Sequence, residues 1–410
     1  MIHKILHTSD WHIGRRLKEH DRTEEFRKFF DDLLRIVHDE NIDALLAAGD
    51  IFDNTTPTVQ AQDIYYSLLS RMVDSPCRHI VIISGNHDSP AFLDAPAELL
   101  KHCRIHIIGQ ARRNPADEVI TLSDSYGTPE LIVCAVPYLR DRDVRTLSPS
   151  DNPSDSESAL IDGIKTHYAR VFERAKELQE KHNIPVIAMG HLFMQGAKTS
   201  TDDNTRELYV GTSIRVGGDI FPEWLTYTAL GHLHSPQKAG GRENIRYSGS
   251  PFAMGFGETG QKKAVYILEL DGKELMALRE VNIPEYQRLE RVSGEWHEIE
   301  SSIHQLGKEN VSIWLDVTHT GSDSPGSLQA RINDILKEYD QLELLSLHDD
   351  SRVNAVIHDT AFDGKTLDDF DPDSIFKAVL DDKNIDEERR NIYIPMYREI
   401  LEKAKTGENS

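Results

Sequence analysis

Apolar and polar positions alternate in blocks over the first 110 residues. Short apolar runs at 5–8, 44–48, 79–84 and 105–108 predict strands. Between them, apolar residues recur at spacings of three and four, as in Phe26, Phe29, Phe30, Leu33 and Val37, which predicts helices over about 23–39, 59–73 and 91–101. Strands that alternate with helices indicate βαβ units and a largely parallel sheet.

Further apolar runs at 131–137, 185–190, 225–231 and 264–270 predict more strands, and a long helix is expected over about 158–182. After Pro284 the runs at 286–292, 296–306, 311–317, 328–339 and 342–347 predict strand, helix, strand, helix and strand. We therefore expect three parts: a main domain over 1–280, a small α/β domain over 281–350 and a tail over 351–410.

The tail is polar and charged, with two short amphipathic stretches at 375–380 and 395–401. Amphipathic helices beyond a finished domain are suited to docking on a partner. Packing back onto the same chain is an equally good interpretation.

Composition narrows the class of protein. Among 410 residues, 39% are hydrophobic and 28% charged, as in soluble globular proteins, and no apolar run is long enough to predict a membrane span. The three isolated cysteines suit a reducing compartment, so we expect a cytoplasmic protein. The net charge of −23 argues against non-specific wrapping of nucleic acid, but it does not exclude a nuclease whose acidic site is neutralised by metal.

Five short polar motifs each follow the end of an apolar run. They are D-W-H at 10–12, G-D-I-F-D at 49–53, G-N-H-D at 85–88, G-H at 190–191 and G-H-L-H at 231–234. Open α/β sheets place their sites at the carboxyl ends of strands, so these motifs can converge on one cleft. Carboxylate, imidazole and amide oxygen favour manganese, iron or zinc over calcium, which indicates a pair of divalent ions.

Each motif taken alone has an ordinary structural interpretation. Asp10 is a possible helix N-cap and Asn86 a possible turn residue. Five such motifs, each at a strand end, argue against a purely structural explanation.

The motif order resembles the calcineurin-like metallophosphoesterase superfamily. The context H-T-S-D-W-H-I-G at the start and R-Y-S-G-S-P at 246–251 is similar to its SbcD-type nuclease family. The resemblance covers nearly all of residues 1–270 and extends more weakly beyond. It implies an α/β sandwich of two sheets flanked by helices, a smaller α/β capping domain that helps seat DNA over the metals, and a C-terminal helical tail.

The resemblance also implies roles for single residues. One ion would be held by Asp10, His12, Asp50 and His234. The other would be held by Asp50, Asn86, His191 and His232, with Asp50 bridging the two. His87 would face the scissile phosphate, and Asp53 would orient His87 by a hydrogen bond. The ions would most naturally be Mn²⁺.

Candidate DNA contacts follow two of these motifs. Arg15 and Arg16 could reach phosphate oxygens, although a solvated start to the next helix explains them equally well. Tyr138, Arg140 and Arg142 follow the strand that ends at Pro137 and are further candidates.

The resulting hypothesis is a manganese-dependent DNA nuclease subunit with double-strand 3′→5′ exonuclease and single-strand endonuclease activity. The family implies an SbcC-type coiled-coil ATPase as partner, a homodimer within a heterotetramer, and a role in DNA end and hairpin processing, recombination and replication. We find no G-x-x-x-x-G-K-[ST] sequence, so ATP would be bound elsewhere. The alternatives are a metallophosphatase or small-molecule phosphodiesterase, and a non-catalytic scaffold, against which intact His87 and Asp53 argue.

Overall fold

The chain divides into two compact units, Met1–Leu289 and Glu290–Ser410. The computed structural model describes residues 2–144, 153–198, 215–321 and 325–349, together with positions 380, 389–390 and 393–398. The predicted docking stretch at 375–380 lies outside the described residues except for Leu380, and the stretch at 395–401 is described only as far as Arg398. No described helix is both long enough and apolar enough to cross a membrane.

The first unit is built on two six-stranded sheets. In the first sheet the strand order is β16-β15-β1-β4-β5-β6. Its parallel strands are β1 (Lys4–Thr8), β4 (Ala44–Ala48), β5 (His79–Ile83) and β6 (Ile105–Ile108), and β15 (Ala264–Asp271) and β16 (Glu274–Asn282) are antiparallel to their neighbours. The parallel core of this sheet confirms the βαβ prediction.

The second sheet has the order β13-β14-β12-β9-β8-β7. Its strands are β7 (Val119–Ser123), β8 (Pro129–Ala135), β9 (Val186–His191), β12 (Tyr227–Gly231), β13 (Gln237–Ala239) and β14 (Arg242–Tyr247). Strands β8, β9, β12 and β14 run parallel to one another. Two short strand pairs complete the unit: β2 (Arg16–Leu17) with β3 (His20–Asp21), and β10 (Phe193–Met194) with β11 (Arg215–Val216).

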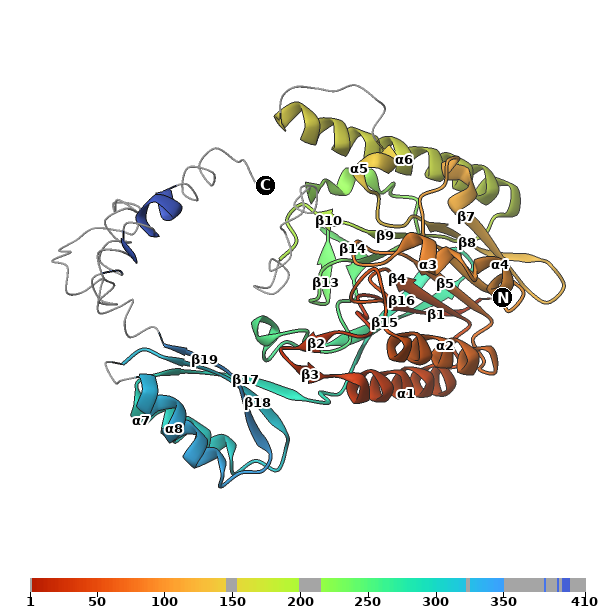
Figure 1. Ribbon diagram of the computed structural model, residues 1–410. Coiled ribbons are helices and arrows are strands. Elements are labelled where there is room, and N and C mark those ends of the chain that lie inside the picture. Colours follow the sequence, from red (N-terminus) through yellow and green to blue (C-terminus); the bar gives the residue numbers. More distant parts are fainter. Residues whose placement is uncertain are drawn as a thin grey trace. The chain divides into compact units, whose positions relative to one another are not determined.

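Three apolar layers hold the sheets and helices together. Leu46 and Val81 of the first sheet pack with Val133 and Ile187 of the second, so the sheets lie face to face. On the outer faces, α1 (Thr23–Glu40) and α2 (Val59–Val73) cover the first sheet, and α6 (Pro153–His182) covers the second (Figure 1). This is the expected sandwich of two sheets flanked by helices.

Helix ends follow local chemistry. Asn41 takes the left-handed conformation that ends α1, and the Thr58 side chain accepts a hydrogen bond from the Ala61 N–H at the start of α2. The single helix expected over 91–101 is wrong: α3 (Pro90–Asp94) and α4 (Ala97–Lys101) are separate. Pro96 lies between them, and a proline cannot donate the main-chain hydrogen bond that would continue α3.

The remaining short helices of the first unit are α5 (Asp141–Val144) and three 3₁₀ turns, η1 (Pro115–Glu118), η2 (Gly218–Ile220) and η3 (Phe256–Glu258). The last of these becomes important at the functional site, because it carries a buried carboxylate.

The second unit has the strand and helix order expected from the sequence. Its sheet, in the order β17-β18-β19, comprises β17 (Arg288–Gly294), β18 (Ile313–His319) and β19 (Leu342–Asp349), and its helices are α7 (Trp296–Leu306) and α8 (Pro325–Leu336). Glu295 and Glu298 form a reciprocal capping box at the start of α7. Ile299 and Ile303 of α7 pack on Leu315 and Val317 of β18, which gives this unit its own core.

Candidate metal centre

The five polar motifs meet at the carboxyl ends of β1, β4, β5, β9 and β12. Main-chain bonds join the first two loops, because the Asp10 N–H donates to the Gly49 carbonyl and the His12 N–H to the Asp50 carbonyl, both at 2.9 Å. The loops are also joined through side chains: the His87 N–H donates to Asp50 Oδ1 at 2.9 Å, and the His232 N–H donates to Asp10 Oδ1 at 2.8 Å. Segments far apart in the sequence therefore form one rigid cluster.

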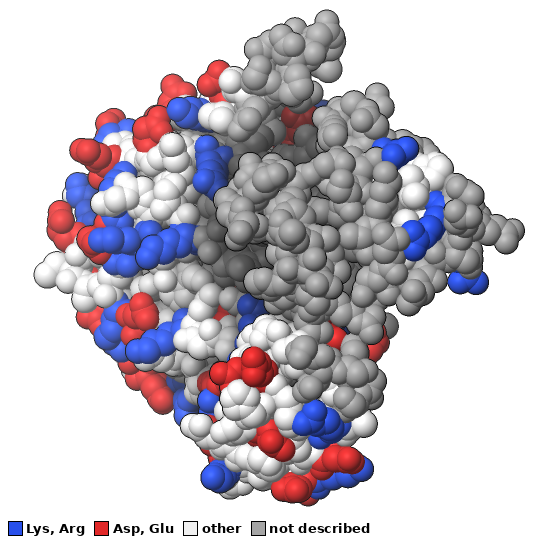
Figure 2. Space-filling view, turned by 90° about the vertical axis from the view of Figure 1, so that its left-hand side faces the viewer, with Lys and Arg blue, Asp and Glu red and all other residues white. Residues whose placement is uncertain are grey.

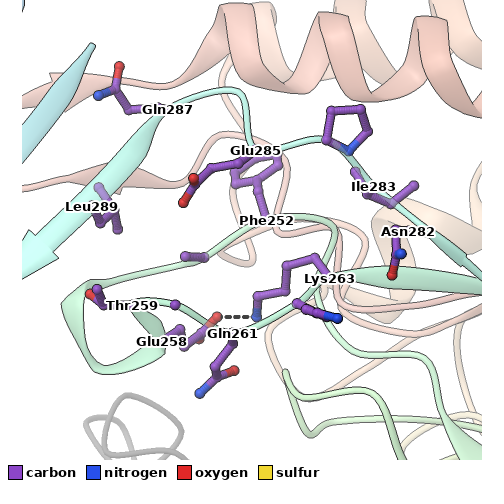
Figure 3. A pocket seen from close by; sticks show the side chains of 14 residues that line it. Phe252, Glu258, Thr259, Gln261, Lys263, Asn282, Ile283, Glu285, Gln287 and Leu289 are labelled. Atoms are coloured by element: carbon purple, nitrogen blue, oxygen red, sulfur yellow. Dashed lines mark hydrogen bonds and ion pairs between the residues drawn. The ribbon is translucent and has the colours of Figure 1, made fainter. Parts of the chain in front are cut away.

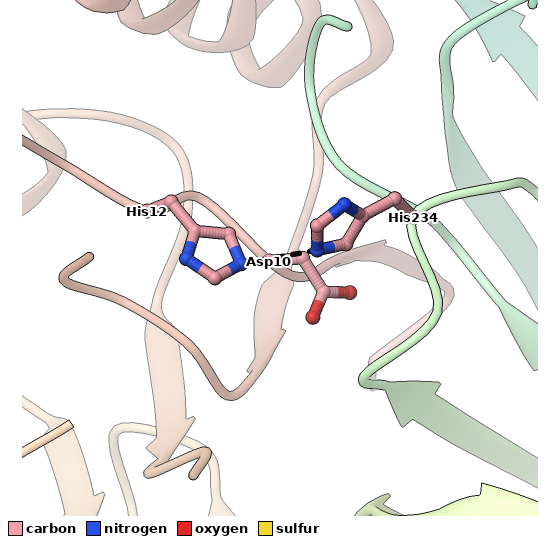
Figure 4. A group of neighbouring side chains, drawn as sticks. All are labelled: Asp10, His12 and His234. Carbon is pink, nitrogen blue, oxygen red and sulfur yellow. Dashed lines mark hydrogen bonds between the residues drawn. The ribbon is translucent and has the colours of Figure 1, made fainter. Parts of the chain in front are cut away.

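One side of the cluster contains Asp10, His12 and His234, whose ligand atoms all lie within 4.8 Å of one another. His12 and His234 turn ring nitrogens toward each other beside Asp10 (Figure 4), with their Nε2 atoms 3.2 Å apart. Asp50 Oδ2 is 3.5 Å from His12 Nε2, so the carboxylate of Asp50 borders this group.

The other side of the cluster contains Asn86, His191 and His232. Asn86 Oδ1 is 3.1 Å from His191 Nε2 and 3.1 Å from His232 Nδ1. Asp50 Oδ2 is 3.4 Å from His191 Nε2. The structure thus brings all seven predicted ligands together, with Asp50 between the two sets.

Hydrogen bonds behind the imidazoles set which nitrogen is available. His191 Nδ1 donates to the Ala48 carbonyl at 2.9 Å, and His234 Nδ1 is 2.7 Å from Glu258 Oε1. Each acceptor holds the proton on Nδ1 and leaves the lone pair of Nε2 facing the cluster. Lone pairs and carboxylates that converge in this way, with few protons between them, fit divalent cations.

Backbone strain is concentrated in the cluster. Asp10, His12 and Asp50 have φ values of 50°, 49° and 48°, and His232 has φ of 104°. Non-glycine residues rarely adopt positive φ, and each such residue costs on the order of 1–3 kcal/mol unless its surroundings enforce it. The strain indicates that the fold holds these side chains for function.

Two motif glycines leave no room for a side chain. A Cβ on Gly85 would lie 2.1 Å from Asp50 Oδ1, and a Cβ on Gly231 would lie 2.0 Å from the Ala48 carbonyl oxygen. Close approach of the backbone to the cluster therefore explains why glycine stands at these strand ends.

Burial and mutual charge shift the pKa values in opposite directions. Burial raises the pKa of Asp10 to about 6 and lowers that of His12 to about 4 and that of His232 to about 3. Burial alone would also raise the pKa of Asp50, but the nearby His191 and His87 hold it well below its usual range. Burial alone would lower the pKa of His191, but the charge of Asp50 outweighs it and raises this pKa to about 9.

His87 lies at the edge of the cluster, partly exposed. Its ring packs edge-on against that of His12, with centroids 4.8 Å apart, and its Nδ1 donates to the main-chain carbonyl of Asp53 at 2.9 Å. The Asp53 carboxylate lies 3.1 Å from the Arg15 guanidinium and 3.6 Å from His12 Nδ1. The hydrogen bond from His87 Nδ1 therefore goes to the main chain of Asp53, and a side-chain role for Asp53 toward His87 stays a prediction.

The candidate DNA contacts divide into two groups. Arg15 pairs with Asp53, Arg140 donates to the Asp88 carbonyl at 3.0 Å, and the Tyr138 ring is 6.2 Å from that of His191, so these three border the cluster. Arg16 is exposed and bonded to the Glu19 carbonyl, and the Arg142 side chain, 67% exposed, lies 3.9 Å from Asp143. Groups of Lys and Arg alternate with groups of Asp and Glu on the face in Figure 2, which does not by itself single out a path for DNA.

Two functional contacts escape sequence reasoning. Asp88 is fully buried and accepts main-chain N–H bonds from Ile51 at 3.0 Å, Phe52 at 2.8 Å and Gly85 at 2.8 Å, so it joins the second and third motifs. Glu258, behind His234, is also fully buried. Asp88 belongs to a motif that could have drawn attention, whereas Glu258 has no motif around it.

Comparison with known proteins agrees with this geometry. Residues 3–236 match the family model of calcineurin-like phosphoesterases, and residues 285–384 match a model described as the type 5 capsule protein repressor C-terminal domain. The first match covers more than half of the chain and contains all five motifs.

Three curated relatives share one name, which makes each of them the D component of the nuclease SbcCD. The protein of Escherichia coli strain K12 is 31% identical over 331 residues, covering 80% of this chain and 81% of the relative. The Bacillus subtilis protein is 32% identical over 84% of this chain and 82% of the relative, and the Rhodobacter capsulatus protein is 37% identical over 66% and 67%.

Proposed function

Because the chain belongs to the SbcD family of calcineurin-like metallophosphoesterases, a family of nuclease subunits, we propose that it is a two-metal, manganese-dependent DNA nuclease acting with an SbcC-type ATPase. Phosphodiester hydrolysis is the activity of its family. The observation that carries the proposal is the convergence of seven metal-ligating side chains from five strand ends, with Asp50 between the two sets.

We assign the first ion to Asp10, His12, Asp50 and His234, and the second to Asp50, Asn86, His191 and His232. Carboxylate, imidazole and amide oxygen are donors that suit Mn²⁺. Two bound divalent ions supply an activated water and neutralise negative charge on a phosphate. The protein contributes fixed positions, because its main-chain bonds and strained residues hold the donors before any ion binds.

His87 is the residue we propose to act on the substrate. Its Nδ1 proton is committed to the Asp53 carbonyl, so Nε2 is the nitrogen that remains for a phosphate oxygen. A doubly protonated ring can donate a hydrogen bond from Nε2 to the scissile phosphate and give that proton to the leaving oxygen.

Substrate preference is the part of the proposal that the metal cluster alone leaves open, because a phosphatase or a small-molecule phosphodiesterase can use the same cluster. The relatives named as nucleases favour DNA. Arg140 and Tyr138, which border the cluster, are the contacts that we propose for the substrate backbone. The expected activities are 3′→5′ exonuclease on double strands and endonuclease on single strands.

The partner proposals rest on the name of the relatives and on exposed apolar residues. That name refers to a complex, SbcCD, and so implies an SbcC component. Tyr393 and Met396 in the tail are 41% and 56% exposed, as a docking segment requires. For a homodimer we propose the α2 stripe, defined as Val59, Tyr66 and Val73. These residues recur every seven positions on one helix face and are 75%, 38% and 48% exposed.

The three cysteines Cys77, Cys103 and Cys134 are free thiols, as expected in a reducing compartment, so we propose that the protein acts in the cytoplasm.

The experiment that tests the proposed function is cleavage of end-labelled single- and double-stranded DNA with and without Mn²⁺, beside hydrolysis of bis-p-nitrophenyl phosphate. DNA cutting that requires Mn²⁺ supports the nuclease. Hydrolysis of the small phosphodiester without DNA cutting, even with the ATPase component added, moves the substrate away from DNA. No hydrolysis of either substrate favours the scaffold alternative.

A further inference from the structure

A buried carboxylate lies directly behind His234. Glu258, at the end of η3, is 0% exposed, and its Oε1 is 2.7 Å from His234 Nδ1. Because a carboxylate accepts, His234 Nδ1 carries the proton and Nε2 carries the lone pair. That Nε2 is the atom that faces His12. The carboxylate therefore fixes both the tautomer and the direction of the ring.

The second oxygen of Glu258 is held from other directions. Oε2 accepts from Lys263 Nζ at 2.5 Å, from the Met254 N–H at 3.1 Å and from Ser250 Oγ at 3.3 Å. With both oxygens bonded, the carboxylate has one orientation, and the ring it supports inherits that orientation.

Lys263 binds the same histidine at a second point. Its ammonium, on a residue that is 6% exposed, donates to Glu258 Oε2, to Ser250 Oγ at 2.9 Å and to the main-chain carbonyl of His234 at 2.9 Å. An ammonium has three N–H bonds, and here all three have acceptors. Lys263 thus ties the backbone of His234 directly and its side chain through Glu258.

We propose that Glu258 and Lys263 are positioning residues that aim Nε2 of His234 at the first metal ion. This proposal rests on the proposed function, in which His234 is a metal ligand. A carboxylate that holds the far nitrogen of a ligating histidine fixes its tautomer and strengthens it as a donor, and its loss costs about 10–100-fold in metal affinity or activity. Lys263 extends the arrangement to a cation, carboxylate, imidazole and metal series.

The surroundings make the pair open to substitution. A cavity of about 350 Å³ is lined by Glu258, Lys263 and Phe252 among others, and Figure 3 shows the bond between Glu258 and Lys263 beside it. Replacing Lys263 by methionine keeps the alkyl chain and leaves this space for water. The fold therefore has room to accommodate the change.

The chain contains a matched control. Glu118 is also 0% exposed, and its Oε2 is 2.8 Å from His167 Nε2, so it is a second buried glutamate paired with a histidine. His167 packs on η1 from α6 and is not among the metal-ligating groups of the described residues. Glu118→Gln thus reproduces the loss of a buried Glu–His bond without touching the cluster.

The experiment uses the full chain and Mn²⁺ alone as the probe. Calorimetric titration and the electron paramagnetic resonance of free Mn²⁺ give the affinity and number of sites for wild type, Glu258→Gln, Lys263→Met, Glu118→Gln and His234→Ala. We expect Glu258→Gln to weaken one of two sites about 10–100-fold, and Lys263→Met to weaken the same site by less. Turnover by Glu258→Gln should recover as Mn²⁺ is raised, whereas Glu118→Gln should show wild-type Mn²⁺ dependence.

The outcomes separate this proposal from the proposed function. If His234→Ala loses one site while Glu258→Gln and Lys263→Met bind both ions as tightly as wild type, the positioning role is wrong and the metal site stands. If His234→Ala binds both ions like wild type, the metal assignment itself is wrong. Circular dichroism of the metal-free proteins reports folding. Should Glu258→Gln not fold, Lys263→Met decides alone, because it keeps the carboxylate.

Discussion

The Nδ1 nitrogen of His87 donates a hydrogen bond to the main-chain carbonyl of Asp53, 2.9 Å away. The Asp53 carboxylate is 3.1 Å from Arg15, so the two halves of this residue have different partners. A backbone acceptor survives any substitution of the Asp53 side chain. The orientation of His87 is therefore expected to depend on the loop more than on the carboxylate.

His87→Gln is expected to lower kcat by about 10²–10⁴-fold, as for the loss of a positioned proton donor. Its binding of Mn²⁺ should be unchanged, because His87 is not one of the seven proposed ligands. Hydrolysis of bis-p-nitrophenyl phosphate at saturating Mn²⁺, with a parallel Mn²⁺ titration, measures both quantities. A His87→Gln protein with wild-type kcat would remove this residue from the reaction.

Asp53→Asn is expected to be milder than His87→Gln, with a loss of about tenfold, because the carbonyl that holds His87 remains. The same assay measures it. A loss as large as that of His87→Gln would mean that the carboxylate, and not the main chain, orients His87.

Gly85→Ala is expected to abolish Mn²⁺ binding, because the new Cβ would lie 2.1 Å from Asp50 Oδ1 and 2.4 Å from the Asp50 nitrogen. Gly127→Ala is the control: Gly127 has φ of +84° and nothing within 4 Å of its added Cβ, so only the backbone cost of about 1–2 kcal/mol applies. Mn²⁺ titration and thermal unfolding distinguish the two variants. Tight Mn²⁺ binding by Gly85→Ala would contradict the close approach of these loops.

His7 is expected to make the protein less stable in acid. Burial lowers its pKa from 6.5 to about 3, although a bond to Leu230 opposes this in part. Between these values the unfolded chain binds one more proton than the folded chain, so stability rises with pH and is lost as pH falls from 6.5 toward 3. The slope contributed by His7 is at most ~1.4 kcal/mol per pH unit.

Urea unfolding of wild type and His7→Gln in chelator between about pH 4.5 and 7 measures this slope. The variant should be less stable throughout, because the bond to the Tyr227 hydroxyl at 3.0 Å is altered, but its free energy of unfolding should fall less steeply in acid. Parallel curves would show that His7 does not carry the proton difference.

The α2 stripe is expected to mediate self-association. Tyr66→Glu combined with Val73→Glu should convert a dimer to a monomer in sedimentation equilibrium, while hydrolysis of bis-p-nitrophenyl phosphate remains, because neither residue lies in the metal cluster. A dimer that persists in this variant would place the contact elsewhere.

Most of the metal cluster could be predicted from the sequence because its motifs sit at strand ends. The runs ending near Thr8, Ala48 and Ile83 are buried strands of one parallel sheet, so their next residues share an edge. Strands such as β14, with the sequence RENIRY, and the largely exposed β16 were not predicted, because their apolar residues are too few to show a pattern.

The remaining parts of the site depend on contacts that sequence spacing does not encode. Glu258 lies 24 residues after His234 in an irregular segment, and only the folded chain brings the two within 2.7 Å. The positive φ values of Asp10 and His12 likewise result from the loops that enclose them. Arg15 was a candidate for phosphate, yet its guanidinium is paired with Asp53, which no local pattern indicates.

The most direct test of the account is Mn²⁺-dependent cleavage of end-labelled DNA by wild type and Asp50→Asn, since Asp50 lies between both sets of ligands. We expect wild type to cut only with Mn²⁺, and Asp50→Asn to remain folded but lose both cutting and the binding of two ions. Cutting by Asp50→Asn at the wild-type rate, or by wild type in excess chelator, would contradict the two-metal nuclease.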